Sequence, residues 1–164
     1  GPVVQFYGFC YPTRMAVARL AGDALFVWSP IALDAALKAE IDALGRVTYL
    51  VSPNKMHYLY LAQWKAAYPA AQLHLPPGLA EKRPDLASGE RLCSDTSATW
   101  SGEIDQVCFG GSPVMSEIVF FHRASRTALF GDLIENFPKG WFSGWRGVVA
   151  WLDGIVTPNG GAPR

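Results

Sequence analysis

The chain has 164 residues, enough for one domain that buries roughly two-thirds of the surface its unfolded form exposes. Half of the residues are apolar and only 17% are charged, which excludes a disordered chain. The 14 lysines and arginines are balanced by 14 aspartates and glutamates, so no excess of positive charge favours a nucleic acid or an anionic membrane, and we expect neither partner. We expect a single domain over residues 1–164, with residues 157–164 as a flexible tail.

The chain contains three cysteines, an odd number with no CxxC spacing. A disulfide framework would favour an even set in a small secreted chain. We therefore expect reduced thiols in a cytoplasmic protein, with a bridge between Cys93 and Cys108 as the alternative.

The first third of the chain is predicted to form strands. An apolar run covers residues 3–9, apolar and polar residues alternate over residues 14–20, and a second apolar run covers residues 24–28. The turn residues between the last two predict a hairpin.

A helix–strand–helix–strand order follows. Asp34 can cap a helix that Gly45 ends, and residues 47–51 are almost wholly apolar, as in a central parallel strand. A second helix is predicted over residues 55–68 and another strand over residues 72–75. This order is typical of α/β layers, and it places both helices on one face of the sheet because parallel crossovers are right-handed.

The second half of the chain is predicted to begin with a long loop over residues 79–100, which is charged and aperiodic and contains at most one helical turn. Three further strands are expected over residues 104–109, 117–122 and 127–131. Residues 136–156 predict a broken helix with four large aromatic side chains, which either cover a sheet or form a surface for a partner. These are Trp141, Phe142, Trp145 and Trp151.

Polar side chains follow the central strand at the point where it meets the second helix. Ligands bind at the carboxyl ends of the strands in open α/β sheets, and a helix N-terminus attracts anions. Asn54, Lys55 and His57 are therefore expected to cluster around an anion or a metal-bound water. The structural alternative is that Asn54 caps the helix, Lys55 is solvated and His57 packs against the first turn.

A carboxylate follows the last predicted strand, directly after a glycine. Asp132 is placed as metal ligands often are, and equally as a simple turn residue. His122 ends the preceding strand of the same hairpin, so strand geometry places it about 17 Å from Asp132. We therefore do not expect His122 and Asp132 to share a ligand.

Four segments of the sequence carry a pattern that covers almost the whole chain. They are SPNKMH at residues 52–57, HLPPGLAEKRPDL at 74–86, GEIDQVCFGGSP at 102–113 and VFFHRASRTALFGDLIENF at 119–137. Together they resemble a bacterial family of unknown function with a metallo-β-lactamase-like fold. The resemblance implies an α/β fold, a four-layered αββα sandwich with mixed sheets. Enzymes of that superfamily are mostly hydrolases with zinc or iron ions at one edge of a sheet.

The metal-binding motif of that superfamily, T-H-x-H-x-D-H, is degenerate in this chain. At its T, H, H, D and H positions stand Ser52, Pro53, Lys55, His57 and Tyr58. A further histidine position falls near Ser112, and the bridging aspartate is retained as Asp132. Because Lys55 places a positive charge where a metal would sit, the resemblance implies no zinc or iron cofactor, and we expect Lys55 to pair with Asp132.

These residues lead to the first functional hypothesis, a metal-free relative of the metallo-hydrolases with a pocket for a small anionic or carbonyl ligand. His57 would act as a general base, and Asp132 would orient His57 or Lys55. Lys55 would polarise a carbonyl or hold an anionic group. Asn54 and Ser112 would contact the substrate.

Two other hypotheses remain open. One is a non-catalytic binding or interaction module that uses the degenerate site or the Trp-rich tail. The other is a metal-dependent hydrolase with unorthodox ligands from His57, Asp132 and His74. The resemblance also implies that relatives continue beyond residue 164, so we expect a truncated chain whose exposed strand edge favours a homodimer.

Overall fold

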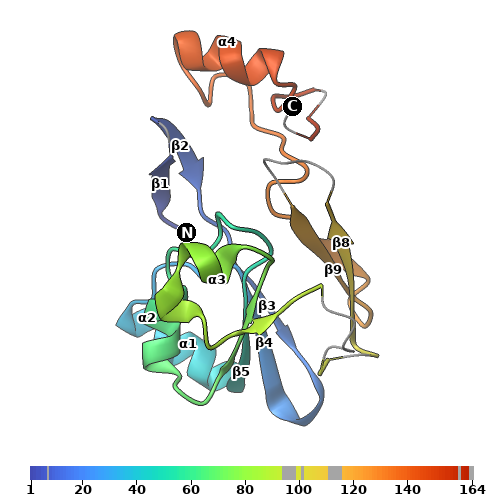
Figure 1. Cartoon of the computed structure of the whole chain (residues 1–164). Helices are drawn as coiled ribbons and strands as arrows, with labels where there is room; N and C mark the ends of the chain where they lie inside the picture. The colour runs from blue at the N-terminus through green and yellow to red at the C-terminus, as the bar shows by residue number, and fades with distance from the viewer. Residues whose placement is uncertain (7, 94–98, 101, 111–115, 159, 163–164) are drawn as a thin grey trace.

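The computed structural model describes residues 1–6, 8–93, 99–100, 102–110, 116–158 and 160–162. Its strands form three sheets of two, three and five strands, and helices lie beside and above them (Figure 1). The fold is therefore mixed α/β, as the order of helices and strands predicts.

The largest sheet has the strand order β3-β4-β5-β6-β7. Its strands are β3 (Ala16–Arg19), β4 (Ala24–Trp28), β5 (Arg46–Val51), β6 (Gln72–Leu75) and β7 (Glu90–Arg91). Strands β3 and β4 are antiparallel, joined through the short 3-10 turn Ala21–Asp23, while the other pairs are parallel. All five residues of β4 are buried, which explains why the parallel strands are apolar runs without alternation.

Three helices cover one face of this sheet (Figure 1). They are α1 (Ala35–Leu44), α2 (Leu61–Ala67) and α3 (Leu79–Lys82). The Asp34 carboxylate accepts the backbone N–H of Leu37 at 2.8 Å and so caps α1, as predicted. Ile41 and Trp64 pack against the sheet in one core cluster, so the prediction that both crossover helices share a face is confirmed.

A second sheet covers the opposite face. It has the order β10-β9-β8, formed by β8 (Ile104–Phe109), β9 (Glu117–His122) and β10 (Thr127–Leu129). Phe26 of the larger sheet makes edge-to-face contacts with Trp100 and Phe120, at centroid distances of 5.0 and 5.5 Å. The layers are therefore helix, sheet, sheet.

The outer face of the smaller sheet carries exposed apolar side chains, Val107, Phe109 and Phe121. No helix covers this face in the part of the chain that the structure describes (Figure 1). The fourth layer of the expected sandwich is thus not seen within these residues.

A third unit lies above the two sheets in Figure 1. Strands β1 (Val3–Phe6) and β2 (Phe9–Pro12) form a hairpin where a single strand over residues 3–9 is predicted. The chain turns at Gly8, whose φ of +78° suits a residue without a Cβ. Helix α4 (Trp145–Leu152) packs with this hairpin around Phe142, so the aromatic tail covers the two-stranded sheet rather than either of the larger ones.

The predicted loop over residues 79–100 contains regular structure. It holds α3, the 3-10 turn Pro84–Leu86 and the edge strand β7. Within the described residues no helix combines the length and apolar character needed to cross a membrane.

Cys93 and Cys108 form a disulfide, so the expectation of three reduced thiols is wrong for these two. Cys93 follows β7 and Cys108 lies on β8, so the bridge joins the larger sheet to the smaller one. Spacing alone does not reveal this, because only the packing of the two sheets brings the Cα atoms to 6.0 Å. Cys10 is free and exposed. The thiols therefore do not support a cytoplasmic location, which stays a prediction.

Candidate functional site

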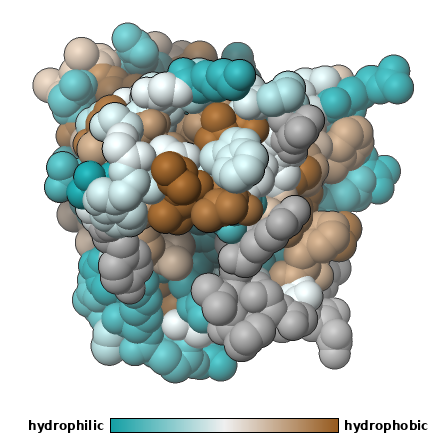
Figure 2. Space-filling model, turned by 90° about the horizontal axis from the view of Figure 1, so that it is seen from above, coloured by the Kyte–Doolittle hydropathy of each residue, from teal (hydrophilic) through white to brown (hydrophobic). Residues whose placement is uncertain are grey.

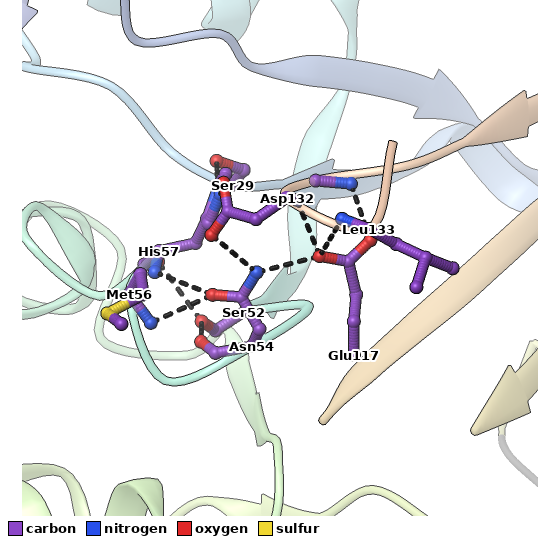
Figure 3. Close-up of polar contacts among 9 residues, drawn as sticks. Ser29, Ser52, Asn54, Met56, His57, Glu117, Asp132 and Leu133 are labelled. Atoms are coloured by element: carbon purple, nitrogen blue, oxygen red, sulfur yellow. Dashed lines mark hydrogen bonds and ion pairs between the residues drawn. The ribbon is translucent and has the colours of Figure 1, made fainter. Parts of the chain in front are cut away.

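Polar side chains converge where the carboxyl ends of the parallel strands meet the smaller sheet (Figure 3). Ser29 follows β4, and Ser52 follows β5. The smaller sheet contributes Glu117, the first residue of β9, and the turn after β10 contributes Asp132. The site thus combines elements that lie far apart in the sequence.

The segment after β5 forms turns that side chains hold in place. The Ser52 hydroxyl lies 2.8 Å from the carbonyl oxygen of Asn54 and 3.1 Å from that of His57. The side-chain oxygen of Asn54 accepts the backbone N–H groups of Met56 and His57. These local bonds compete with a regular helix, which explains why α2 begins at Leu61 rather than at the predicted residue 55.

His57 is hydrogen-bonded through both ring nitrogens. Nδ1 lies 2.6 Å from Ser29 Oγ, and Nε2 lies 3.1 Å from Asp132 Oδ1. An ionised carboxylate only accepts hydrogen bonds, so Nε2 carries the proton and Nδ1 accepts the hydroxyl proton of Ser29. We assign this tautomer from the hydrogen bonds. Ser29, His57 and Asp132 therefore form one continuous chain of hydrogen bonds, the relay.

The electrostatic environment keeps Asp132 ionised. Burial favours its neutral form, but the hydrogen bond from His57, the attraction of the His57 ring when it is protonated and the hydrogen bond from Asn54 outweigh burial and lower the pKa of Asp132. The relay therefore retains its negative end at neutral pH.

The sequence does not predict a role for Ser29, because Ser29-Pro30 is typical of a residue pair that ends a strand. Its φ is +50°, an uncommon conformation for a serine, at the sharp turn directly after β4. Its backbone N–H donates to Val51 O at 2.9 Å, which holds the turn beside β5. Hydrolases present nucleophilic serines on sharp turns after strands, and strained residues gather at functional sites. The position after a strand at the carboxyl edge was the signal available.

Glu117 was also missed, and it is the most deeply buried acid of the site, 1% exposed. Its carboxylate accepts backbone hydrogen bonds at 2.8, 2.6 and 3.2 Å from three consecutive residues, Gly131, Asp132 and Leu133. It also accepts the Asn54 amide at 2.8 Å. Glu117 therefore fixes the turn that carries Asp132. No local pattern reveals this, since a glutamate at a strand end is usually solvated.

The residues of the site do not fit a zinc or iron ion. The Asn54 amide nitrogen lies between two carboxylates, 2.8 Å from Glu117 and 3.0 Å from Asp132, so N–H groups occupy the space a shared cation would need. The second Asp132 oxygen and both nitrogens of His57 are bonded within the relay. Across the described residues, no group of three or more His, Cys, Asp or Glu is arranged to hold a metal.

The family of the chain follows from a comparison with protein-family models. The model described as domain of unknown function (DUF4336) matches residues 4–142. The chain belongs to the DUF4336 family. The DUF4336 region contains the whole relay together with Asn54 and Glu117, and it ends before α4. No curated protein compared with the chain matches it.

The DUF4336 match confirms the resemblance to a family of unknown function. It does not test the metallo-β-lactamase-like fold, which remains a proposal. Of the site residues predicted in this DUF4336 chain, the structure brings together Asn54, His57 and Asp132. Ser112 lies outside the described residues.

Lys55 of the DUF4336 chain does not join this group. No ion pair links it to Asp132 among the residues that the structure describes, so the expected pair is wrong. Both oxygens of Asp132 already bind His57 and Asn54, and the Lys55 stem lies against Gly78, where a Cβ would be 3.2 Å from Lys55 Cδ. Lys55 is thus turned toward the start of α3.

Acidic groups lie near the relay on the side that faces the third unit, the one formed by the β1-β2 hairpin and α4. Burial, then the charges of Asp132, Asp153 and Glu117, raise the pKa of Glu135 to about 7. Burial, then the charge of Glu135, raise the pKa of Tyr11 to about 12. Glu135 is thus a carboxyl group that titrates near neutral pH close to the relay.

The two other histidines lie outside the relay. His74 is buried against Trp100, and burial lowers its pKa to about 4. His122 lies on the surface and hydrogen-bonds Ser125 Oγ at 2.7 Å, away from Asp132 as expected.

Proposed function

We propose that this chain is a hydrolase that cleaves a small ester through a nucleophilic serine. The observation that carries the proposal is the 2.6 Å contact between Ser29 Oγ and His57 Nδ1, with Asp132 bound to the opposite ring nitrogen. This arrangement makes His57 the base for Ser29 and lets Asp132 stabilise the imidazolium that forms.

The proposed reaction has two steps, acylation of Ser29 and hydrolysis of the acyl-serine. In the first, Ser29 Oγ attacks the ester carbonyl carbon while its proton passes to His57 Nδ1; the bond to the leaving alcohol then breaks, and His57 returns the proton to the alcohol. In the second, water attacks the acyl-serine, His57 takes the water's proton, and the carboxylic acid leaves as Ser29 recovers its hydroxyl proton. Asp132 remains ionised throughout.

The roles of the neighbouring residues follow from their contacts. The Asn54 amide is committed to Glu117 and Asp132, so Asn54 is a positioning residue for Asp132 rather than the substrate contact that the sequence suggests. Lys55 lies on the same edge of the sheet, and we keep it as the group that holds an anionic substituent of the substrate.

The metallo-β-lactamase-like fold is part of the proposal. Two facing sheets, with helices on the outer face of the larger one, support it. The site chemistry proposed for this chain differs from that of the metal enzymes, because amide and imidazole hydrogen bonds replace metal ligation.

The test combines turnover with covalent labelling. Wild-type protein and Ser29→Ala are assayed with p-nitrophenyl acetate, and both are treated with a fluorophosphonate, which labels nucleophilic serines. A matched control exists in the chain, since Ser125 also hydrogen-bonds a histidine nitrogen, but within the described residues no carboxylate contacts that histidine, His122.

We expect Ser29→Ala to abolish ester turnover and labelling, whereas Ser125→Ala keeps both. Peptide mass spectrometry should place the phosphonyl group on Ser29. Labelling elsewhere, or equal turnover in the wild type and Ser29→Ala, would overturn the proposal.

A further inference from the structure

Helix α4 presents an apolar side to solvent (Figure 2, viewed from the side on which α4 lies). Its outward stripe consists of residues spaced i, i+3, i+4 and i+7, with exposed fractions of 60, 58, 44 and 61% for Trp145, Val148, Val149 and Leu152. Trp151 beside the stripe is 71% exposed. The side of α4 that packs against the rest of the protein covers a smaller part of the helix surface, and Ala150 is buried there.

This distribution is the inverse of an ordinary surface helix, whose polar side faces water. The charged residues of the segment, Arg146 and Asp153, are half-buried rather than solvent-facing. The Arg146 guanidinium lies over the Trp145 ring, 4.9 Å from its centroid, and near Gly8 of the hairpin. Solvent exposure of four or five large apolar side chains on one helix marks an interaction surface.

We propose that this stripe is a self-association surface, on which α4 of one copy packs antiparallel against α4 of a second copy. The i, i+3, i+4, i+7 spacing is the one that helices use to interlock along a seam. A two-fold axis between positions 148 and 149 makes the stripe self-complementary, with Trp145 of each copy facing Leu152 of the other.

The area is sufficient for a dimer. The five exposed side chains of α4 offer roughly 600 Å² per copy, taking aromatic side chains as 150–250 Å² each. Two copies then bury more than about 1,000 Å² in total, the size that a specific interface needs. The interface core would be aromatic and free of charge, as in stable dimers.

The charges at the two ends of the helix complement each other in this arrangement. The N-terminal end carries Arg146 and the C-terminal end carries Asp153. Antiparallel packing brings each end against the opposite end of the second copy, so that the two helix dipoles are opposed and unlike rather than like charges stand behind each end of the seam. A parallel pair would bring like charges together.

Sedimentation velocity of the full chain tests the proposal. We expect a dimer in the wild type and at least a tenfold larger dissociation constant in Val148→Lys. The matched control is Val107→Lys on the outer face of the smaller sheet, where the native side chain is 56% exposed, nearly as much as Val148. Circular dichroism confirms that each variant is folded, and Leu152→Lys serves as the second stripe variant if Val148→Lys fails to fold.

Cross-linking tests the antiparallel geometry independently. In a Cys10→Ser background, which removes the free thiol, Val149→Cys lies near the two-fold axis and should form an intermolecular disulfide under mild oxidation. Val107→Cys should not.

Either of two results would overturn the proposal. One is a monomeric wild type, including a monomer that co-sediments with phosphatidylcholine–phosphatidylserine vesicles through the stripe, which would assign α4 to a lipid surface. The other is a dimer that Val107→Lys dissociates and Val148→Lys does not, which would place the interface on the smaller sheet.

Discussion

His57 Nε2 lies 3.1 Å from Asp132 Oδ1, although 75 residues separate the two in the sequence. His57 follows β5 of the larger sheet, and Asp132 follows β10 of the smaller one, so this contact spans the two sheets. The relay therefore depends on how the sheets pack, and on the groups that hold the turn of residues 131–133. Catalysis and stability are consequently separable by mutation.

Asp132→Asn tests the orienting role of the carboxylate. The amide can present an N–H group to His57 Nε2, which favours the imidazole tautomer protonated on Nδ1, and that tautomer cannot accept the proton of Ser29. We expect kcat for ester hydrolysis to fall by about 10³- to 10⁴-fold with little change in KM.

The control for this variant is Asp105→Asn, which removes a surface carboxylate bound to Arg123 at 2.7 Å. Its kcat should equal that of the wild type. Equal kcat values for Asp132→Asn and the wild type would show that the carboxylate does not serve the reaction.

Glu117→Gln tests the buried acid that fixes the turn. Glutamine replaces an acceptor-only carboxylate by a group that carries two N–H donors, and these would face backbone N–H groups that now bind Glu117. We expect a loss of about 2–4 kcal/mol in the free energy of unfolding, measured by urea denaturation.

The comparison variant is Glu103→Gln on the surface, where the carboxylate accepts one backbone N–H, from Ala21 at 2.9 Å. Its loss should stay below about 1 kcal/mol. Similar losses for the two variants would mean that the buried network contributes no more than one exposed hydrogen bond.

Local pattern predicts the scaffold of this site well. The predicted bounds of β4, β6, β8 and β9 match the structure, because strands that pack against a core carry apolar residues at their buried positions. The Asp34 cap and Gly45 likewise delimit α1. The two-stranded hairpin is not predicted, because the residues on both sides of Gly8 are apolar. The sequence therefore resembles one continuous strand, although the chain turns at this glycine.

Non-local hydrogen bonds explain what the sequence does not predict. Asn54, His57 and Asp132 follow strands and are found from that position alone. Glu117 acquires its role only through the 131–133 turn of another element, and Ser29 follows β4 but gains its partner only where His57 packs beside it. The expected Lys55–Asp132 pair is wrong for the same reason, since Asn54 and His57 bind the Asp132 carboxylate instead.

Glu135→Gln tests the carboxyl group that titrates near the relay. Burial, then neighbouring acids, raise the pKa of Glu135 from 4.5 to about 7, so the folded state binds this proton more tightly than the unfolded state. Its contribution to stability is therefore fully present below about pH 4.5 and is lost as the pH rises through about 7. Glutamine, which carries no charge, should raise the unfolding free energy at pH 8 by about 1 kcal/mol after allowance for solvent screening.

At about pH 3, well below the ordinary pKa of a glutamate, the same substitution should leave the melting temperature nearly unchanged, because Glu135 is then protonated in both states. Thermal denaturation at the two pH values measures the difference. Glu40→Gln, an exposed position on α1, provides the baseline. An equal shift at both pH values would point to packing rather than to titration.

Reduction of the Cys93–Cys108 disulfide tests the covalent link between the sheets. The bridge closes a loop with a sequence separation of 15 residues, which restricts the unfolded chain, so its removal should lower the unfolding free energy by about 3 kcal/mol. Urea denaturation with and without dithiothreitol measures this loss. The double variant Cys93→Ser/Cys108→Ser should show the same lower stability and no response to the reductant.

Thiol titration of the native protein decides whether the bridge forms in solution. Cys10 is free and exposed, so one thiol should react before reduction and three after reduction and unfolding. Three reactive thiols in protein purified without reductant would contradict the bridge. In that case the two sheets would be held without a covalent link, by apolar packing around Trp100 and Phe120 and by hydrogen bonds such as His57–Asp132, and dithiothreitol would leave the wild type's stability unchanged.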